Sequence, residues 1–288
     1  MPKTQVNFIG CGRLGKTIAS LLVKNQAATI RGVVNSSLAS SNKAIRFIGQ
    51  GKAFEKISKL PPADIYFITT HDDIIQRVCD ELAIALKSGA IVVHCSGALS
   101  SDVLKKVEEY NCYAVSIHPI KSFANLSESI NTFAGTYCTI EGNKKAANII
   151  IPLFEKIGGK VLPIHKENKK FYHIGGVLAN NYFVTLHYYA LQCYIAAGIP
   201  KVAAEKIVAT LITEPLNNIK LGHEKILTGP LSRGDSEVIK EHIAVLENRP
   251  ILKNLYVSLG QGALPLTHHT DAKKEELEKI LTLSPSSR

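Results

Sequence analysis

Short apolar runs alternate with amphipathic stretches over the first 165 residues of the chain. Apolar runs rich in β-branched residues predict buried strands, and apolar residues spaced three and four apart predict helices. The predicted strands are Gln5–Ile9, Thr29–Val34, Ile65–Thr69, Ala90–His94, Ala114–Ile117, Tyr137–Glu141 and Lys160–Pro163. The helices predicted between them include Asp73–Leu86, Ser101–Glu109 and Lys144–Ile157. This alternation predicts an α/β fold with a doubly wound parallel sheet.

From about Lys166 onward the strand pattern ends and apolar residues recur at helical spacing only. The predicted helices are Phe171–Ala197, Lys201–Leu211, Glu214–Lys225, Ser236–Glu247 and Pro250–Leu259. Prolines separate several of them, because proline lacks an amide donor and restricts the residue before it. We therefore predict two domains, an α/β domain over residues 1–165 and an all-α domain over residues 166–288.

The first predicted strand runs straight into the motif Gly10-x-Gly12-x-x-Gly15. In this spacing the first glycine permits a tight turn, the second lets the backbone approach a pyrophosphate, and the third lets the helix pack closely on the strand. Helical spacing and a second strand follow, which is the context that a dinucleotide-binding unit requires. The sequence therefore predicts a dinucleotide at the amides of the helix N-terminus. A glycine turn without a ligand is the alternative.

The position after the second strand distinguishes the two nicotinamide cofactors. NAD-binding proteins usually place an acid there to hold the ribose diol, but this chain has Asn35-Ser36-Ser37, with Arg31, Lys43 and Arg46 nearby. Because no acid is present to repel a 2′-phosphate, the sequence favours NADP over NAD. The residues expected to bind the cofactor are Gly10, Cys11, Gly12, Arg13, Leu14, Gly15, Asn35, Ser36, Ser37, Thr69 and Thr70.

Polar residues follow other predicted strand ends, where the open edge of a parallel sheet places ligands. Ser96 and the Gly97 amide are expected to hold a substrate carboxylate or carbonyl, or else to form an ordinary serine turn. His118, fixed before a proline, is a candidate proton carrier, with a structural histidine as the alternative. Asp72 and Asp73 are expected to cap the helix that follows them.

Polar residues also interrupt the apolar surface of the predicted helical domain. His173, Gly176 and Asn180 lie on nearly one face of its first helix, with Asn181 adjacent. Because buried polar groups need partners, this row is expected to contact a ligand, to form an interhelical hydrogen bond or to pack against the other domain. Arg233 carries a donor fork suited to an anion, or else it ties down its own loop by bonding carbonyls.

Composition narrows the class of protein further. The 288 residues carry a formal net charge of +10, but no basic tract is interleaved with aromatic residues, so an anionic small molecule is a simpler partner than nucleic acid. The six cysteines are scattered singly, which indicates neither a metal site nor a disulfide framework, and Cys95 is expected to serve packing. Neither a membrane-spanning run nor the pattern of a signal peptide is present, so we expect a cytoplasmic protein.

Taken together, these motifs resemble the family of paired Rossmann-like and DUF2520 domains, near the 6-phosphogluconate-dehydrogenase-type reductases. The residues that carry the resemblance are Gly10-x-Gly12-x-x-Gly15, His94 to Ala98, His118-Pro119, Ser122-Phe123, Tyr172-His173, Asn181-Tyr182, Gly229-Pro230, Arg233-Gly234-Asp235 and His242. The resemblance covers nearly the whole chain. It implies a Rossmann-type sheet followed by a helical domain like the C-terminal domain of 6-phosphogluconate dehydrogenase, and a homodimer formed through the helical domain.

The wider group includes pyrroline-5-carboxylate reductase, prephenate dehydrogenase and 3-hydroxyisobutyrate dehydrogenase, which reduce or oxidise small carboxylic acids with NAD(P). His118-Pro119 resembles the His-Pro of prephenate dehydrogenase, whose histidine engages the reacting hydroxyl. The hydroxyacid dehydrogenases carry a catalytic lysine one helical turn before an asparagine, whereas Val177 occupies that place before Asn181 here. The proton carrier is therefore unassigned between His118 and His173.

The sequence thus favours an oxidoreductase that transfers a hydride between NADP, or NAD, and a small carboxylic acid bound between the two domains. The candidate catalytic residues are His118, His173, Asn181 and Ser96, and the candidate substrate ligands are Ser96, Gly97, Asn181 and Arg233. The alternative is a non-catalytic dinucleotide sensor or interaction module, which is suggested by the missing lysine.

Overall fold

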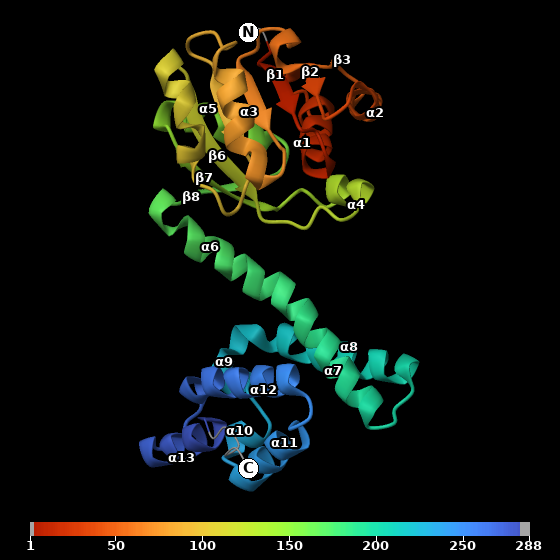
Figure 1. The fold of residues 1–288 in the computed structure, drawn as a ribbon, viewed down its shortest axis with the longest axis vertical. Helices are drawn as coiled ribbons and strands as arrows, with labels where there is room; N and C mark the ends of the chain where they lie inside the picture. The colour runs from red at the N-terminus through yellow and green to blue at the C-terminus, as the bar shows by residue number, and fades with distance from the viewer. Residues whose placement is uncertain (1–2, 283–288) are drawn as a thin grey trace. The chain divides into compact units, whose positions relative to one another are not determined.

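A computed structural model of the chain describes residues 3–282 (Figure 1). The chain divides into two compact units, with the division between Ala179 and Asn180. The predicted domain boundary after residue 165 stays a proposal, and it falls just after the last strand of the sheet.

The first unit is built on one eight-stranded sheet with the order β3-β2-β1-β4-β5-β6-β7-β8. The strands are β1 Gln5–Ile9, β2 Thr29–Val34, β3 Lys52–Phe54, β4 Ile65–Ile68, β5 Ile91–His94, β6 Tyr113–Pro119, β7 Tyr137–Gly142 and β8 Lys160–Pro163. Every neighbouring pair is parallel except β6 and β7, which are antiparallel. The chain begins β7 at the edge where β6 ends, which reverses its direction. The predicted doubly wound sheet is confirmed, with this one reversal and with the short edge strand β3 in addition.

Helices cover both faces of this sheet because adjacent strand residues point to opposite sides. Phe8 and Phe67 belong to the apolar cluster that α1, α2 and α5 cover, whereas Ile9 and Ile68 belong to the cluster under α3 and η3. The helical segments of this unit are α1 Arg13–Lys24, α2 Leu38–Ile48, η1 Ile57–Lys59, η2 Asp72–Ile74, α3 Ile75–Ala83, η3 Ser101–Tyr110, α4 Leu126–Asn131, α5 Lys144–Lys156, η4 Lys166–Asn168 and α6 Lys169–Gly176.

Neither Asp72 nor Asp73 caps a helix, so that prediction is wrong. The N-cap positions of η2 and α3 are His71 and Ile74, and neither makes a side-chain capping bond. The carboxylate of Asp72 accepts a hydrogen bond from the Ser96 hydroxyl instead, at 2.7 Å. The Asp72 side chain, which the sequence predicts as a local cap, is therefore bonded to a residue far away in the sequence.

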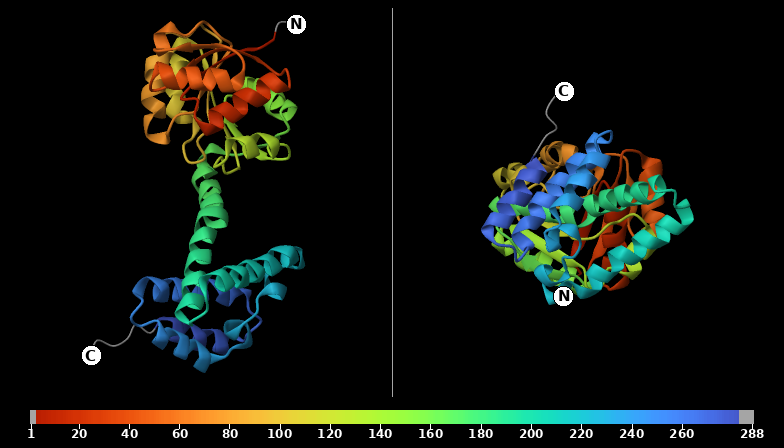
Figure 2. Two further views of the ribbon diagram at one scale, coloured as in Figure 1. Left: turned by 90° about the vertical axis from the view of Figure 1, so that its right-hand side faces the viewer. Right: turned by 90° about the horizontal axis from the view of Figure 1, so that it is seen from below.

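The second unit is helical, and Figure 2 shows its helices from two further directions. Its segments are α7 Phe183–Ala196, α8 Lys201–Asn218, η6 Ile219–Leu221, α9 His223–Ile226, α10 Pro230–Arg233, α11 Ser236–Val245, α12 Pro250–Ala263, η7 Leu264–Leu266 and α13 Asp271–Thr282. The π-helix η5 Val177–Tyr182 lies between α6 and α7. Within residues 3–282 no strand follows Pro163, as predicted. The predicted separation between Leu211 and Glu214 is wrong, because α8 continues through Pro215.

Two apolar clusters hold the second unit. Leu191 of α7 packs with Ala204 and Val208 of α8, and Ile239 of α11 packs with Leu277 and other residues of α13. Across the described range, no helix combines the length and apolar character that crossing a bilayer needs.

Candidate functional site

The glycine-rich turn between β1 and α1 lies at the carboxyl edge of the sheet. Gly10 has a φ of +79°, and a Cβ there would lie 2.8 Å from the amide nitrogen of Thr70. A Cβ at Gly15 would lie 2.5 Å from Oγ1 of Thr69. The first glycine is therefore required by the turn, and the third by the close approach of α1 to the end of β4.

Gly12 has no such internal reason to be glycine. Its φ is an ordinary −78°, and a Cβ there would meet only the Gly10 carbonyl oxygen, at 3.9 Å. Gly12 lines a pocket, so any side chain at this position would take up space next to the N-terminus of α1. The open space is what a bound phosphate group needs to reach the helix amides.

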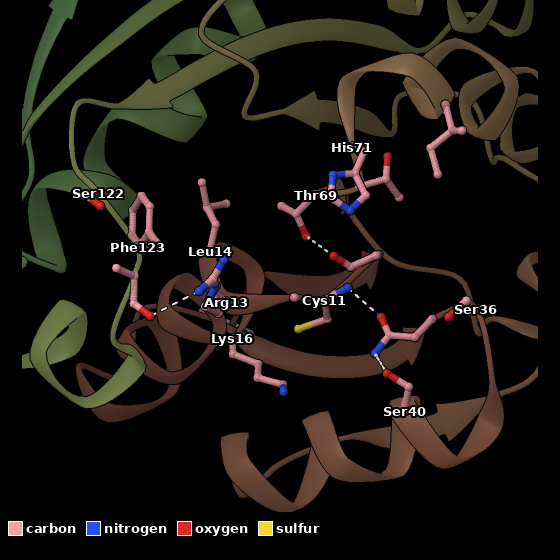
Figure 3. A pocket seen from close by; sticks show the side chains of 16 residues that line it. Cys11, Arg13, Leu14, Lys16, Ser36, Ser40, Thr69, His71, Ser122 and Phe123 are labelled. Atoms are coloured by element: carbon pink, nitrogen blue, oxygen red, sulfur yellow. Dashed lines mark hydrogen bonds between the residues drawn. The ribbon is translucent and has the colours of Figure 1, made fainter. Parts of the chain in front are cut away.

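This pocket has a volume of about 600 Å³ and is shown in Figure 3. It is lined by Gly10, Cys11, Gly12, Arg13, Leu14, Lys16, Asn35, Ser36, Ser40, Thr69, Thr70, His71, Ile74, Ser122, Phe123 and Ala124. Of the residues predicted to bind the cofactor, only Gly15 and Ser37 do not line it. Ser37 instead caps α2, and its hydroxyl accepts a hydrogen bond from the Ser40 amide.

Sequence reasoning missed the part of this pocket that comes from the segment after β6. The guanidinium of Arg13 donates to the Ala124 carbonyl at 3.2 Å, which ties that segment to the glycine loop (Figure 3). Ser122-Phe123 was visible in the sequence only as part of the family resemblance. Its position follows from the order of the strands, which local patterns do not reveal.

Asn35 organises the opposite side of the pocket. Its Oδ1 accepts the Cys11 amide at 2.6 Å, and its Nδ2 donates to the Ser40 hydroxyl at 3.2 Å (Figure 3). The Thr69 hydroxyl donates to the Gly10 carbonyl at 3.0 Å. An amide side chain therefore stands where an acid would hold a ribose diol.

The polar groups of the pocket suit an anionic ligand. Among the described residues that line it, none carries a carboxylate, and Arg13 and Lys16 are basic. Oγ1 of Thr70 is buried and has no hydrogen-bond partner among the described residues. Buried polar atoms normally have partners. The open Gly12, the basic side chains and this hydroxyl all fit a dinucleotide.

A second cluster of polar residues forms where α6 meets the carboxyl edge of the sheet. Lys169, Tyr172 and His173 are spaced so that they share one helix face. The Lys169 ammonium bonds Ser116 on β6 and Glu141 on β7, the Tyr172 hydroxyl bonds His118, and the His173 ring lies beside Gly97. One helix face thus brings three side chains to two neighbouring strands and the turn after β5.

His118 is the centre of this cluster. Its Nδ1 is hydrogen-bonded to the Tyr172 hydroxyl, and the two rings meet edge-on with centroids 5.6 Å apart. Burial, and then the positive charge of Lys169 and the neighbouring His173, lower the pKa of His118 to about 4. The imidazole is therefore neutral near pH 7, which is the form that accepts a proton.

Gly97 lies against both histidine rings. A Cβ at Gly97 would lie 2.9 Å from Cε1 and Nε2 of His118 and 3.0 Å from Nδ1 of His173. Any side chain there would displace both rings. Within the described residues the Gly97 amide donates no backbone or side-chain hydrogen bond. The two predicted proton carriers are thus brought together at the turn that carries the predicted amide donor.

The turn itself is held by His94 and Ser96. The Ser96 amide donates to Nδ1 of His94 at 3.1 Å, so the other ring nitrogen carries the proton and bonds the Ser100 carbonyl, also at 3.1 Å. Burial lowers the pKa of His94 to about 3, which keeps the ring neutral. The Ser96 hydroxyl donates to Asp72 and accepts the amides of Ala98 and Leu99. Its single proton is already used, so this geometry favours the serine-turn alternative.

The other predicted residues are Cys95, which has a packing environment, and Asn181 and Arg233, which belong to the second unit. Cys95 is buried, and burial raises the pKa of its thiol, which keeps sulfur in its protonated, unreactive form. Arg233 bonds Oδ2 of Asp235 through Nε at 2.8 Å and Nη2 at 2.7 Å, so it holds its own loop through a carboxylate rather than through carbonyls. Among the described residues, no group of acids, histidines and cysteines has the arrangement of a metal site.

Two family models match the sequence. A Rossmann-like domain matches residues 1–119, and DUF2520, a domain of unknown function, matches residues 136–263. The second match begins at the strand β7, so it includes the last two strands of the sheet. No curated protein matches the sequence.

Several solved structures share the fold. A Bacteroides fragilis protein, provisionally described as an NADP oxidoreductase, aligns with a TM-score of 0.73 at 19% identity over 90% of this chain and 97% of its own. A Thermotoga maritima protein aligns with a TM-score of 0.72 at 28% identity over 91% and 97%. A pyrroline carboxylate reductase from Plasmodium falciparum with NADP bound aligns with a TM-score of 0.57 at 14% identity over 98% and 100%. These likenesses show the fold.

Proposed function

The chain belongs to the family that pairs a Rossmann-like domain with a DUF2520 domain, and from its site we propose that it is an NADP-dependent oxidoreductase acting on a small carboxylic acid. The observation that carries the proposal is the proximity of two histidines to the edge of a sheet that also holds a dinucleotide-type pocket. A nicotinamide would supply the hydride chemistry, and the chain would supply binding, orientation and proton transfer.

The pocket supports the cofactor half of this proposal. Gly10 to Leu14 would hold the pyrophosphate at the N-terminus of α1, with Arg13 and Lys16 balancing its charge. Asn35, Ser36 and Ser40 would face the adenosine ribose. These side chains accept a 2′-phosphate without repulsion, which is why we favour NADP over NAD.

The histidine cluster supports the proton-transfer half. His118 is neutral near pH 7 and hydrogen-bonded by Tyr172, so it would accept a proton from a substrate hydroxyl, or return one to a carbonyl in the reverse direction. The Gly97 amide would donate to the substrate oxygen. His173 is the second candidate for the same proton, because its ring also lies beside Gly97. Asn181 and Arg233 remain candidate ligands for the substrate carboxylate.

The first test is a titration of the purified protein with NADPH and, separately, with NADH, followed by nicotinamide fluorescence. We expect tighter binding of NADPH, lost in Gly12→Asp, whose added carboxylate would occupy the phosphate position. Gly175→Asp is the matched control, because Gly175 also has open space around it and does not line the pocket. Failure of both nucleotides to bind would refute the proposed function.

A dinucleotide sensor is the second candidate function. Val177 stands where hydroxyacid dehydrogenases carry their lysine, which is the observation that favours this candidate. Consumption of NADPH with a panel of oxo and imino acids separates the two functions. An enzyme consumes NADPH with at least one of them, whereas a sensor binds it without turnover.

We also propose a homodimer formed through the helical domain. Val184 and Tyr188 lie four residues apart on α7 and are 62% and 54% exposed, so they form an apolar surface on one face of the helix. Light scattering should give a mass of about twice 31.3 kDa. The variant Val184→Glu should shift it toward the monomer, and Lys201→Glu, a change at an exposed polar position, should not. A wild-type monomer at all concentrations would refute the dimer.

A further inference from the structure

Lys169 is a buried charge that the proposed mechanism does not use. Its side chain is only 2% exposed, although lysine is almost never fully buried without a partner. Its ammonium bonds the Ser116 hydroxyl and lies 3.2 Å from Oε1 of Glu141, whose side chain is 3% exposed. Lys170, the next residue, is exposed. The chain therefore pairs two opposite charges inside the unit rather than at its surface.

This ion pair connects the three segments that carry the histidine cluster. Glu141 accepts the Ser101 amide at 2.8 Å and the Ser101 hydroxyl at 2.7 Å, which holds the start of η3 just after the Gly97 turn. Ser116 precedes His118 by two residues on β6, so both side chains point to the same face of the sheet. Lys169 begins α6, which carries Tyr172 and His173. Each segment is thus bonded to the same buried pair.

His94, Ser116 and Glu141 lie in register across β5, β6 and β7. Ser116 is the middle residue of this row and bonds the Lys169 ammonium, which therefore lies next to the strand that carries His118. The carboxylate oxygens of Glu141 are turned to Ser101 by their hydrogen bonds. The titratable groups around His118 are Lys169, Tyr172 and His173 on α6 and His94 on β5. Those around Lys169 are Glu141 on β7, the Cys95 thiol and Asp72 on η2, which is bonded to Ser96. Burial lowers the pKa of Lys169, and the Glu141 carboxylate opposes that shift and favours the charged ammonium.

We propose that Lys169 is a positioning residue for the proton carrier: its ammonium, held by Glu141 and Ser116, fixes the Tyr172 face of α6 against the sheet and, in addition to burial, disfavours protonation of the His118 imidazole. The inference deepens the proposed function and rests on it for its catalytic meaning. The electrostatic effect of Lys169 on His118 does not depend on the proposed function, because the protonation state of His118 is measurable without substrate or cofactor. The reduced pKa of His118 is consistent with this arrangement.

The test is an NMR titration of the imidazole signals in the full-length protein, with His118→Asn used to assign the signal of His118. In Lys169→Met we expect the titration midpoint of His118 to rise by about one pH unit, because the positive charge that opposes protonation of the ring is gone. Lys170→Met is the matched control, since it removes the same charge from the next, exposed position. Its midpoint should equal that of the wild type.

Lys169→Met leaves Glu141 without its cation, so the single variant is paired with Lys169→Met/Glu141→Gln. The double variant removes both charges and keeps a side chain that bonds Ser101. The midpoint of His118 should rise there also. The Lys169 ammonium bonds Ser116, two residues from His118 on β6, whereas the Glu141 carboxylate is turned toward Ser101, so the loss of the cation should outweigh the loss of the anion at His118. A midpoint unchanged in the double variant, with or without a loss of thermal stability, would overturn the proposal and leave Lys169 a purely structural anchor.

The same variants give a second readout once a substrate is found. The acid limb of kcat/KM should move to higher pH in Lys169→Met, in parallel with the NMR midpoint, and should stay in place in Lys170→Met. If neither nucleotide binds but the midpoint moves, the proposed function fails and the electrostatic role of Lys169 stands.

Discussion

The Tyr172 hydroxyl and Nδ1 of His118 are hydrogen-bonded, although the two residues lie on different elements and are 54 positions apart in the sequence. The bond fixes which edge of the imidazole is free. With Nδ1 taken by Tyr172, Nε2 is the ring nitrogen beside Gly97. The Tyr172 hydroxyl thereby decides where His118 can exchange a proton.

Removing either partner should affect turnover and spare cofactor binding. His118→Asn is expected to lower kcat by roughly a hundredfold, in the range that a general acid or base supplies. Tyr172→Phe keeps the ring but loses the hydrogen bond, so its expected loss is smaller, about tenfold. NADPH affinity should be unchanged in both, because neither residue lines the glycine pocket. Steady-state kinetics with a nucleotide titration checks this, and full activity in His118→Asn with a large loss in His173→Asn would transfer the role to His173.

Gly15, the last glycine of the loop motif, and Gly12, the middle one, should respond differently to alanine. Gly15→Ala places a Cβ 2.5 Å from Oγ1 of Thr69 and should destabilise the protein by about 1–3 kcal/mol. Thr69→Ala removes that oxygen, so the double variant should recover much of the loss. Gly12→Ala should change stability by less than about 1 kcal/mol, since its Cβ has room, and should weaken nucleotide binding. Denaturation should be monitored by circular dichroism, because the chain has no tryptophan to serve as a fluorescent probe. Equal destabilisation by both alanines would contradict this reading of the pocket.

Asn35→Asp should change the choice of cofactor. The carboxylate can still accept the Cys11 amide and can accept from the Ser40 hydroxyl, so the local structure should survive. The added negative charge should weaken NADPH relative to NADH by about tenfold or more, or about 1.4 kcal/mol. Ser37→Asp is the control, because it adds the same charge at the N-cap of α2, where the helix N-terminus offsets it. An unchanged ratio of the two dissociation constants would argue against Asn35 at the ribose.

The depressed histidine pKa values predict a loss of stability in acid. The pKa values of His118 and His94 are about 4 and about 3 in the folded protein, against 6.5 for an ordinary histidine. Between these values the unfolded chain binds protons that the folded chain does not, so the free energy of unfolding falls as pH decreases from about 6.5. For His118 the contribution is at most about 3 kcal/mol. Urea unfolding at pH 7, 5.5 and 4.5 should show a smaller decrease in His118→Asn than in the wild type. Identical slopes would show that His118 is not protected from protonation.

Local patterns in the sequence are sufficient to predict the fold class and to identify the cofactor motif. The strands β1, β2 and β8 have their predicted ends, and the all-helical character of the chain after Pro163 was read from spacing alone. These features are local: alternation, helical period and a glycine spacing are written in neighbouring residues. The positive φ of Gly10 and the crowding at Gly15 also follow from that spacing.

Which polar residues meet one another depends on the folded arrangement of the chain. Lys169 reads as one of several lysines at the start of a helix, yet it is buried against Glu141. The sequence predicts a helix cap at Asp72 and leaves Ser96 open between a substrate ligand and a serine turn, whereas in the structure the two side chains are hydrogen-bonded to each other. These pairings depend on strand order and on the contact of α6 with the sheet edge. Such long-range contacts leave no periodic trace in the sequence, because burial and hydrogen bonding act between residues that only the folded chain brings together.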